Sequence, residues 1–195
     1  TMLFDFIKRF WFINPSTGFF IGGGGGSTAR YQITNSVRLR ASASAYFQRA
    51  AAVSATATKA TTSFWLKRGA LLASLPTLFG SASGFVFQLA GASGAAADTI
   101  RCYGSAGLGS TTEYISTDVF RDPAAWYHFC VIFDTTAAAA DRLQVWVNNR
   151  RVAQANANYP TASGNINWQT TAQVQYIGTY GGAGYADGYF ADFYH

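Results

Sequence analysis

The sequence predicts an all-β domain made of two antiparallel sheets packed face to face. Short segments rich in β-branched and aromatic residues recur at close intervals, with Gly, Ser and Asn between them. Helical signals are weak, because the Ala-rich segments 50–60, 95–97 and 137–140 carry no apolar stripe. This pattern is typical of a sandwich. We expect about nine strands, at 36–40, 62–68, 78–80, 85–89, 99–103, 126–134, 142–147, 172–177 and 188–193.

Apolar patterning places individual strands within the sheets. Segment 126–134 is apolar on both faces, which predicts a central strand. Segment 143–147 alternates, so one face should cover the core, and Asn148 and Asn149 should form a tight turn after it because Asn tolerates positive φ. In the last strand, simple alternation places Asp192 on the face opposite residues 189, 191 and 193.

The N-terminal residues differ in composition from the rest of the chain. Residues 1–21 form an aromatic arm, residues 22–29 a glycine-rich hinge, and residues 30–195 the domain. Asp5, Lys8 and Arg9 interrupt the apolar run of the arm, so a membrane anchor is not expected. The arm needs a surface to cover its aromatic residues, on its own domain, a sister subunit or another protein. The candidate anchoring residues are Phe4, Phe6, Phe10, Trp11, Phe12, Phe19 and Phe20.

Charge and cysteine content narrow the range of partners. The net charge is +5, but no run of five or more Lys and Arg residues occurs, so nucleic acid is not an expected partner. Only 12% of residues are charged, which suits a neutral surface that contacts proteins or sugars or is merely solvated. Cys102 and Cys130 lie in predicted strands and could pair across the sandwich or remain free thiols.

Five segments, in this order, resemble a laminin G-like, concanavalin A-like jelly roll, in particular the versions found in bacteriophage structural proteins. They are 64–68, 122–128 with 134–136, 141–149, 176–178 and 187–193. The resemblance covers roughly residues 36–193 and not the arm. It implies a jelly-roll arrangement of the two sheets, with Asn149 replacing the glycine usual in the family's hairpin turn.

Enzymatic members of this fold imply a catalytic pattern that the sequence lacks. Glycoside hydrolases use two carboxylates, here implied as Glu-x-Asp-x-x-Glu on one strand. The chain has one glutamate, Glu113, in a Ser/Thr-rich connection. His128, the only internal histidine, lies in an apolar strand and is expected to be a packed histidine of the core or of a sheet edge. We therefore expect no catalytic residues and no enzyme activity.

Ligand sites are indicated more weakly. Many relatives bind calcium at the rim of the sandwich. Here the aspartates that flank loops are Asp98, Asp118, Asp134, Asp141 and Asp187, but their positions in the sequence do not indicate several carboxylates converging on one ion. No cofactor is therefore predicted, and calcium stays an alternative. Aromatic residues in Gly- and Asn-rich loops suit either sugar binding or padding of the loops. The candidate glycan-binding residues are Trp168, Tyr180, Tyr185 and Asn167.

Taken together, these features and the resemblance predict a non-catalytic structural or adhesion module of a phage virion, such as a tail, fibre or capsid-decorating component. Its expected location is the virion, and its expected partners are other virion subunits or copies of itself, held by the arm. The alternative is an extracellular carbohydrate-binding domain for receptor recognition or secreted adhesion, with a cell-surface glycan as partner. Neither nucleic acid nor a membrane is an expected partner.

Overall fold

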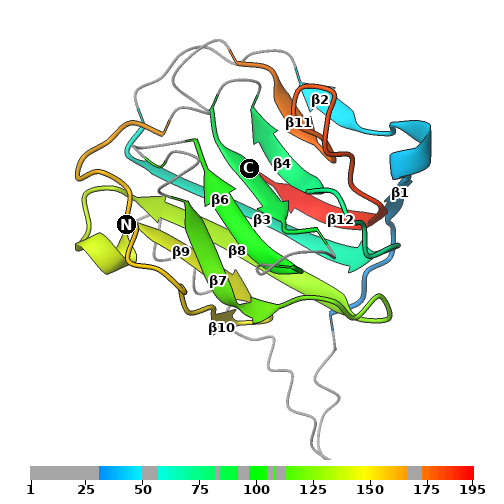
Figure 1. Ribbon diagram of the computed structural model, residues 1–195, viewed down its shortest axis with the longest axis horizontal. Helices are drawn as coiled ribbons and strands as arrows, with labels where there is room; N and C mark the ends of the chain where they lie inside the picture. Colours follow the sequence, from blue (N-terminus) through cyan, green and yellow to red (C-terminus); the bar gives the residue numbers. More distant parts are fainter. Residues whose placement is uncertain are drawn as a thin grey trace, which may run out of the picture. The chain divides into compact units, whose positions relative to one another are not determined.

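The computed structural model describes residues 31–49, 57–81, 84–91, 97–104, 108, 113–166 and 173–195. The chain divides into two units, Thr1–Asn35 and Ser36–His195. The arm, its seven candidate anchoring residues and the hinge lie outside the described residues, so the three-part division of the chain stays a prediction. The larger unit is an all-β sandwich, as the sequence predicts (Figure 1).

Two six-stranded antiparallel sheets make up the described part of this sandwich. Sheet A has the order β1 (Val37–Leu39), β12 (Gly188–Tyr194), β3 (Lys59–Arg68), β8 (Trp126–Asp134), β9 (Leu143–Val147) and β10 (Arg150–Arg151). Sheet B has the order β2 (Phe47–Arg49), β11 (Gln175–Ile177), β4 (Thr77–Ser81), β5 (Val86–Leu89), β6 (Thr99–Tyr103) and β7 (Tyr114–Val119). The described helices are single 3₁₀ turns, η1 (Ala41–Ala43) and η2 (Ala139–Asp141), and none of them has the length and apolarity needed to cross a membrane.

Strand β8 is central, as the apolar pattern predicts. It lies between β3 and β9, and its register with β3 runs from Lys59 opposite Asp134 to Lys67 opposite Trp126. Strand β9 alternates buried and half-buried residues, so one face covers the core. The turn after β9 is also confirmed, because Asn148 and Asn149 have φ values of 49° and 65°.

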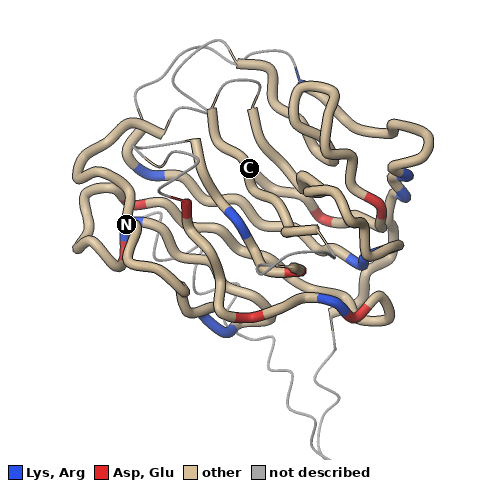
Figure 2. Tube along the Cα trace, viewed as in Figure 1, with Lys and Arg blue, Asp and Glu red and all other residues tan. Residues whose placement is uncertain are grey.

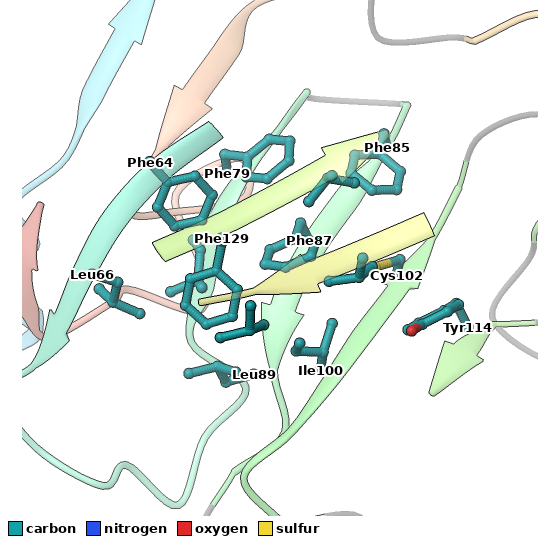
Figure 3. Close-up of a cluster of buried hydrophobic side chains, with 14 of the residues drawn as sticks. Phe64, Leu66, Phe79, Phe85, Phe87, Leu89, Ile100, Cys102, Tyr114 and Phe129 are labelled. Atoms are coloured by element: carbon teal, nitrogen blue, oxygen red, sulfur yellow. The ribbon is translucent and has the colours of Figure 1, made fainter. Parts of the chain in front are cut away.

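Aromatic side chains from both sheets fill the space between them (Figure 3). Phe64 of β3 lies at the centre, with its ring 5.4 Å from that of Phe129 on β8 and 5.6 Å from that of Phe79 on β4. Offset and edge-to-face pairs of this kind add about 0.5–1.5 kcal/mol each beyond area burial. The core therefore joins the two sheets mainly through phenylalanine.

The last strand departs from simple alternation. Asp192 has a φ of 47°, and the pairing of β12 with β3 shifts register between Ala191 and Tyr194. This bulge turns Phe193 toward the core, where its ring lies 5.4 Å from that of Phe64. The prediction that residues 189, 191 and 193 share one face was therefore wrong.

The structure also corrects two readings of local structure. The segment containing Tyr114–Val119, which the sequence suggests is a connection after Glu113, is edge strand β7. His128 lies on the outer face of central strand β8, half-buried with its ring 4.9 Å from Trp65, and not in the core or at a sheet edge. Strands β2 and β10 were likewise not predicted, because both are short and mostly exposed.

Both cysteines are free thiols. Cys102 is fully buried on the inner face of β6, whereas Cys130 is half-buried on the outer face of β8 opposite Ser63 and Trp146. A pairing across the sandwich would require Cys130 to point inward.

Candidate functional site

Three tyrosines from separate segments meet on the outer side of sheet B, and we call them the tyrosine cluster. Tyr46 precedes β2, Tyr176 lies on β11, and Tyr185 lies in the loop before β12. The ring of Tyr46 is 6.0 Å from that of Tyr176 and 6.2 Å from that of Tyr185, with interplanar angles of 58° and 42°. Tyr46 is 41% exposed, so solvent reaches the cluster.

Strand pairing explains why these rings meet. Tyr176 is opposite Gln48 on β2, whereas its neighbour Ile177 is opposite Phe47 and packs against the core. Because side chains alternate along a strand, Tyr176 and Gln48 point outward. The site therefore combines tilted aromatic rings with an exposed amide that can both donate and accept hydrogen bonds.

A tight turn positions the loop that carries Tyr185. Tyr180 and Ala183 exchange both backbone hydrogen bonds, at 2.9 and 3.0 Å, around Gly181 and Gly182. These two glycines have φ values of 57° and 87°, which side-chain-bearing residues rarely adopt. The Gly184 carbonyl then accepts a 2.7 Å hydrogen bond from the Thr77 amide, which fixes the loop to β4.

The candidate glycan-binding residues separate into three groups. Tyr185 joins the tyrosine cluster. Tyr180 lies near Tyr103 on β6 and not in the tyrosine cluster. Burial raises the pKa of Tyr103, and the nearby Tyr180 phenol raises it further, so the Tyr103 hydroxyl keeps its proton at neutral pH. Trp168 and Asn167 lie outside the described residues.

Every aspartate considered for a calcium site at the rim has a basic partner. Arg68 binds Asp98 at 2.7 Å, Arg150 binds Asp118, Lys59 binds Asp134 at 2.8 Å, Arg151 binds Asp141 at 2.7 Å, and Arg38 binds Asp187 at 3.1 Å. Figure 2 shows acidic and basic positions spread as neighbours over the domain. A search of the described residues finds no group of three or more His, Cys, Asp or Glu side chains placed to hold a metal ion. A calcium ion bound by these aspartates would have to displace the basic partners.

Glu113 also has a basic partner. The Nε atom of Arg101 on β6 donates a 2.9 Å hydrogen bond to its carboxylate. The backbone carbonyl of Glu113 accepts a hydrogen bond from Asn156. In this position the carboxylate holds β6 to the start of β7.

A second group of aromatic residues lies on the outer face of sheet A. Trp65, Trp126, Trp146 and Tyr189 are all half-buried there. The Arg38 guanidinium lies 4.9 Å from the centre of the Tyr189 ring, and the Trp146 indole donates to Gln144. This face is the natural comparison for any test of the tyrosine cluster.

The two-sheet topology agrees with a family comparison. The family model of the concanavalin A-like lectin/glucanases superfamily, of the laminin G type, matches residues 40–194. The chain belongs to this superfamily. No curated protein matches the sequence of this concanavalin A-like chain.

Several solved structures share this fold. A candidate carbohydrate-binding protein from Bacteroides ovatus superposes with a TM-score of 0.58 at 18% identity, over 76% of this chain and 40% of that one. Domain 4 of an extracellular arabinanase from Geobacillus stearothermophilus, in complex with arabinotriose, superposes with a TM-score of 0.51 at 15% identity, over 75% of this chain and 63% of that one. This chain thus spans less than two thirds of either protein.

Two members of the tyrosine cluster were missed at the sequence level. Tyr46 shows no pattern that marks it as part of a site, because β2 is too short to be predicted. Tyr176 does have a signal, since alternation with the apolar Ile177 indicates that it points outward. What the pattern lacks is the pairing of β2 with β11, which brings the two tyrosines together.

Proposed function

We propose that the domain is a non-catalytic carbohydrate-binding module and that the tyrosine cluster is its sugar-contacting surface. The observation that carries the proposal is the meeting of Tyr46, Tyr176 and Tyr185 on an open face of sheet B. A sugar ring presents a face of C–H groups that packs on aromatic rings, while its hydroxyls need donors and acceptors such as phenols and amides. Tilted rings offer two such surfaces at an angle, with Gln48 beside them.

The comparisons give this proposal further support. The Bacteroides ovatus protein is described as a candidate carbohydrate-binding protein, and the arabinanase domain was solved with arabinotriose bound. The absence of catalysis is part of the proposal and rests on Glu113, the only glutamate of the chain, which Arg101 engages. An extracellular or virion location would bring such a module into contact with cell-surface glycans.

The test is a glycan array with the full chain, followed by affinity measurements on variants. Tyr185→Ala and Tyr46→Ala should each weaken binding of an array hit by about tenfold or more, as expected for an aromatic residue at the centre of a contact. Trp146→Ala on the outer face of sheet A is the matched control and should bind as the wild type does. If only Trp146→Ala loses binding, the sugar contacts the outer face of sheet A, and the proposal that the tyrosine cluster contacts sugar is refuted.

A second candidate function is favoured by the sequence of the arm. Seven aromatic residues precede five consecutive glycines, a composition that suits anchoring of a tethered segment to neighbouring subunits of a virion. We propose the virion role on this ground alone. Deleting residues 1–21 should then leave a folded domain that no longer assembles, as measured by light scattering. Assembly that is unchanged by the deletion would contradict the anchoring role.

A further inference from the structure

A cavity of about 270 Å³ opens between the two sheets, on the side where β2 and β11 form the edge of sheet B. Its walls come from β2, β4, β11 and the end of β12; β2 and β11 lie in the upper right of Figure 1, and β4 and the end of β12 lie nearer its centre. The tyrosine cluster uses the outer face of β11, whereas this cavity lies mainly on its inner side, where Gln175 and Ile177 point.

The inner wall of the cavity is apolar. It is formed by Phe47, Phe79, Ile177 and Phe193. The rings of Phe79 and Phe193 lie 5.9 Å apart at 76°, and Phe193 reaches this position because of the bulge at Asp192. Apolar cavities hold water poorly and favour apolar guests.

The cavity also has a positive group among its lining residues. Arg49 on β2 is exposed and donates to the neutral amide oxygen of Gln175. Six other described arginines bind carboxylates, namely Arg38, Arg68, Arg101, Arg121, Arg150 and Arg151. Within the described ranges Arg49 has no ion pair, so its charge remains available to an anion. Guanidinium groups bind carboxylates through two parallel hydrogen bonds.

We propose that this cavity binds a small amphiphilic carboxylate, with its acid group on Arg49 and a short aliphatic or single-ring body against the phenylalanines. The size agrees with this class, because a cavity of roughly 150 Å³ accepts benzene and typical drug-sized sites begin near 300 Å³. The charge of Arg49 selects an anion over a neutral or cationic molecule of the same length. This site adjoins the proposed sugar-contacting surface, because Gln48 and Tyr176 also line the cavity, whereas Tyr46 and Tyr185 do not.

Isothermal titration of the full chain with octanoate, octanol and octylammonium tests the chemistry of the ligand. Octanoate should bind saturably, octanol should bind at least about tenfold more weakly, and octylammonium should show no binding, because a charge-assisted hydrogen bond accounts for roughly that difference. Equal affinity for octanoate and octanol would overturn the role of Arg49. Absence of octanoate binding would overturn the site.

Variants locate the site. Arg49→Gln should weaken octanoate by about tenfold and leave octanol unchanged, and Arg49→Lys should retain part of the affinity. Arg150→Gln is the matched control, because Arg150 is likewise an exposed arginine on an edge strand, β10. This variant should bind octanoate as the wild type does. The amide resonances of Ile177 and Phe193, the methyl resonances of Ile177 and the ring resonances of Phe193 should shift on binding. Tyr185→Ala should keep its octanoate affinity, which distinguishes the cavity from the sugar-contacting surface. An unchanged octanoate affinity in Arg49→Gln would refute the cavity proposal.

Discussion

The ion pair between Arg68 and Asp98 should be the electrostatic contact whose loss costs the domain most stability. Arg68 ends β3, and Asp98 precedes β6, with side-chain exposures of 2% and 6% and an Nη1–Oδ1 distance of 2.7 Å. The same Arg68 nitrogen donates to the Phe120 carbonyl, and the Phe120 amide donates to the Asp98 carbonyl at 2.8 Å. The pair therefore joins both sheets and the β7–β8 connection.

The perturbation that removes the carboxylate charge is Asp98→Asn, which also removes the 3.5 Å contact of Asp98 with the exposed Arg121. Asp98 has a φ of 60°, and Asn is the residue that best tolerates this conformation after glycine, so the backbone should be retained. The substitution leaves the Arg68 cation buried, with its Nη2 atom already lacking a hydrogen-bond partner. Breaking a buried pair from one side costs about 3–5 kcal/mol. For a domain of this size, that loss lowers Tm by roughly 6–20 °C.

Thermal unfolding followed by circular dichroism measures the effect. Asp141→Asn is the matched control, because the Asp141–Arg151 pair is 46% and 40% exposed and should contribute less than about 1 kcal/mol. The double variant Arg68→Met, Asp98→Asn removes the buried charge and should recover much of the loss. A change below about 0.5 kcal/mol in Asp98→Asn would show that the reasoning from burial is wrong.

Two further predictions concern β8 and its turn. Burial lowers the pKa of His128 below its ordinary 6.5, although the nearby Asp192 opposes this shift. As the pH falls, the unfolded chain therefore takes up the proton before the folded domain does. The free energy of unfolding should fall as the pH drops below about 6.5. His128→Gln should reduce that slope in urea titrations between pH 7 and pH 5, where the remainder comes from His195, whose pKa burial lowers to about 4, and an unchanged slope would contradict the assignment. Asn148→Ala removes the acceptor of the 2.8 Å hydrogen bond from the His128 amide and places Ala at a φ of 49°. The variant should lower the free energy of unfolding by about 1–3 kcal/mol, as measured by urea denaturation. A variant as stable as the wild type would show that the turn does not need Asn.

The fold could be predicted wherever burial on one or both faces left a mark on the sequence. The nine expected strands are all present, because segments such as Trp126–Asp134 and Leu143–Val147 carry period-two or continuous apolar patterns. Strand β7 was missed because it lies at the edge of sheet B and carries Ser116, Thr117 and Asp118, which read as a polar connection. The bulge at Asp192 was missed because a single left-handed residue leaves no periodic signal.

The candidate site could be predicted only in part, for a similar reason. Tyr185 stands out in a glycine-rich loop, but its partners Tyr46 and Tyr176 become neighbours through the pairing of β2 with β11. Long-range pairing of a short edge strand is invisible to local patterns. The inter-sheet cavity depends on the same pairing and on the bulge that turns Phe193 inward.

The central claim, that the tyrosine cluster contacts sugar, is tested most directly by an NMR titration of the full chain with the oligosaccharide that a glycan array selects. Resonances of Tyr46, Tyr176 and Tyr185 should shift together and saturate, and those of Trp126 and Trp146 on sheet A should not. Saturable shifts confined to the sheet A tryptophans would contradict the claim. So would the absence of shifts in the three tyrosines at the highest oligosaccharide concentration of the titration.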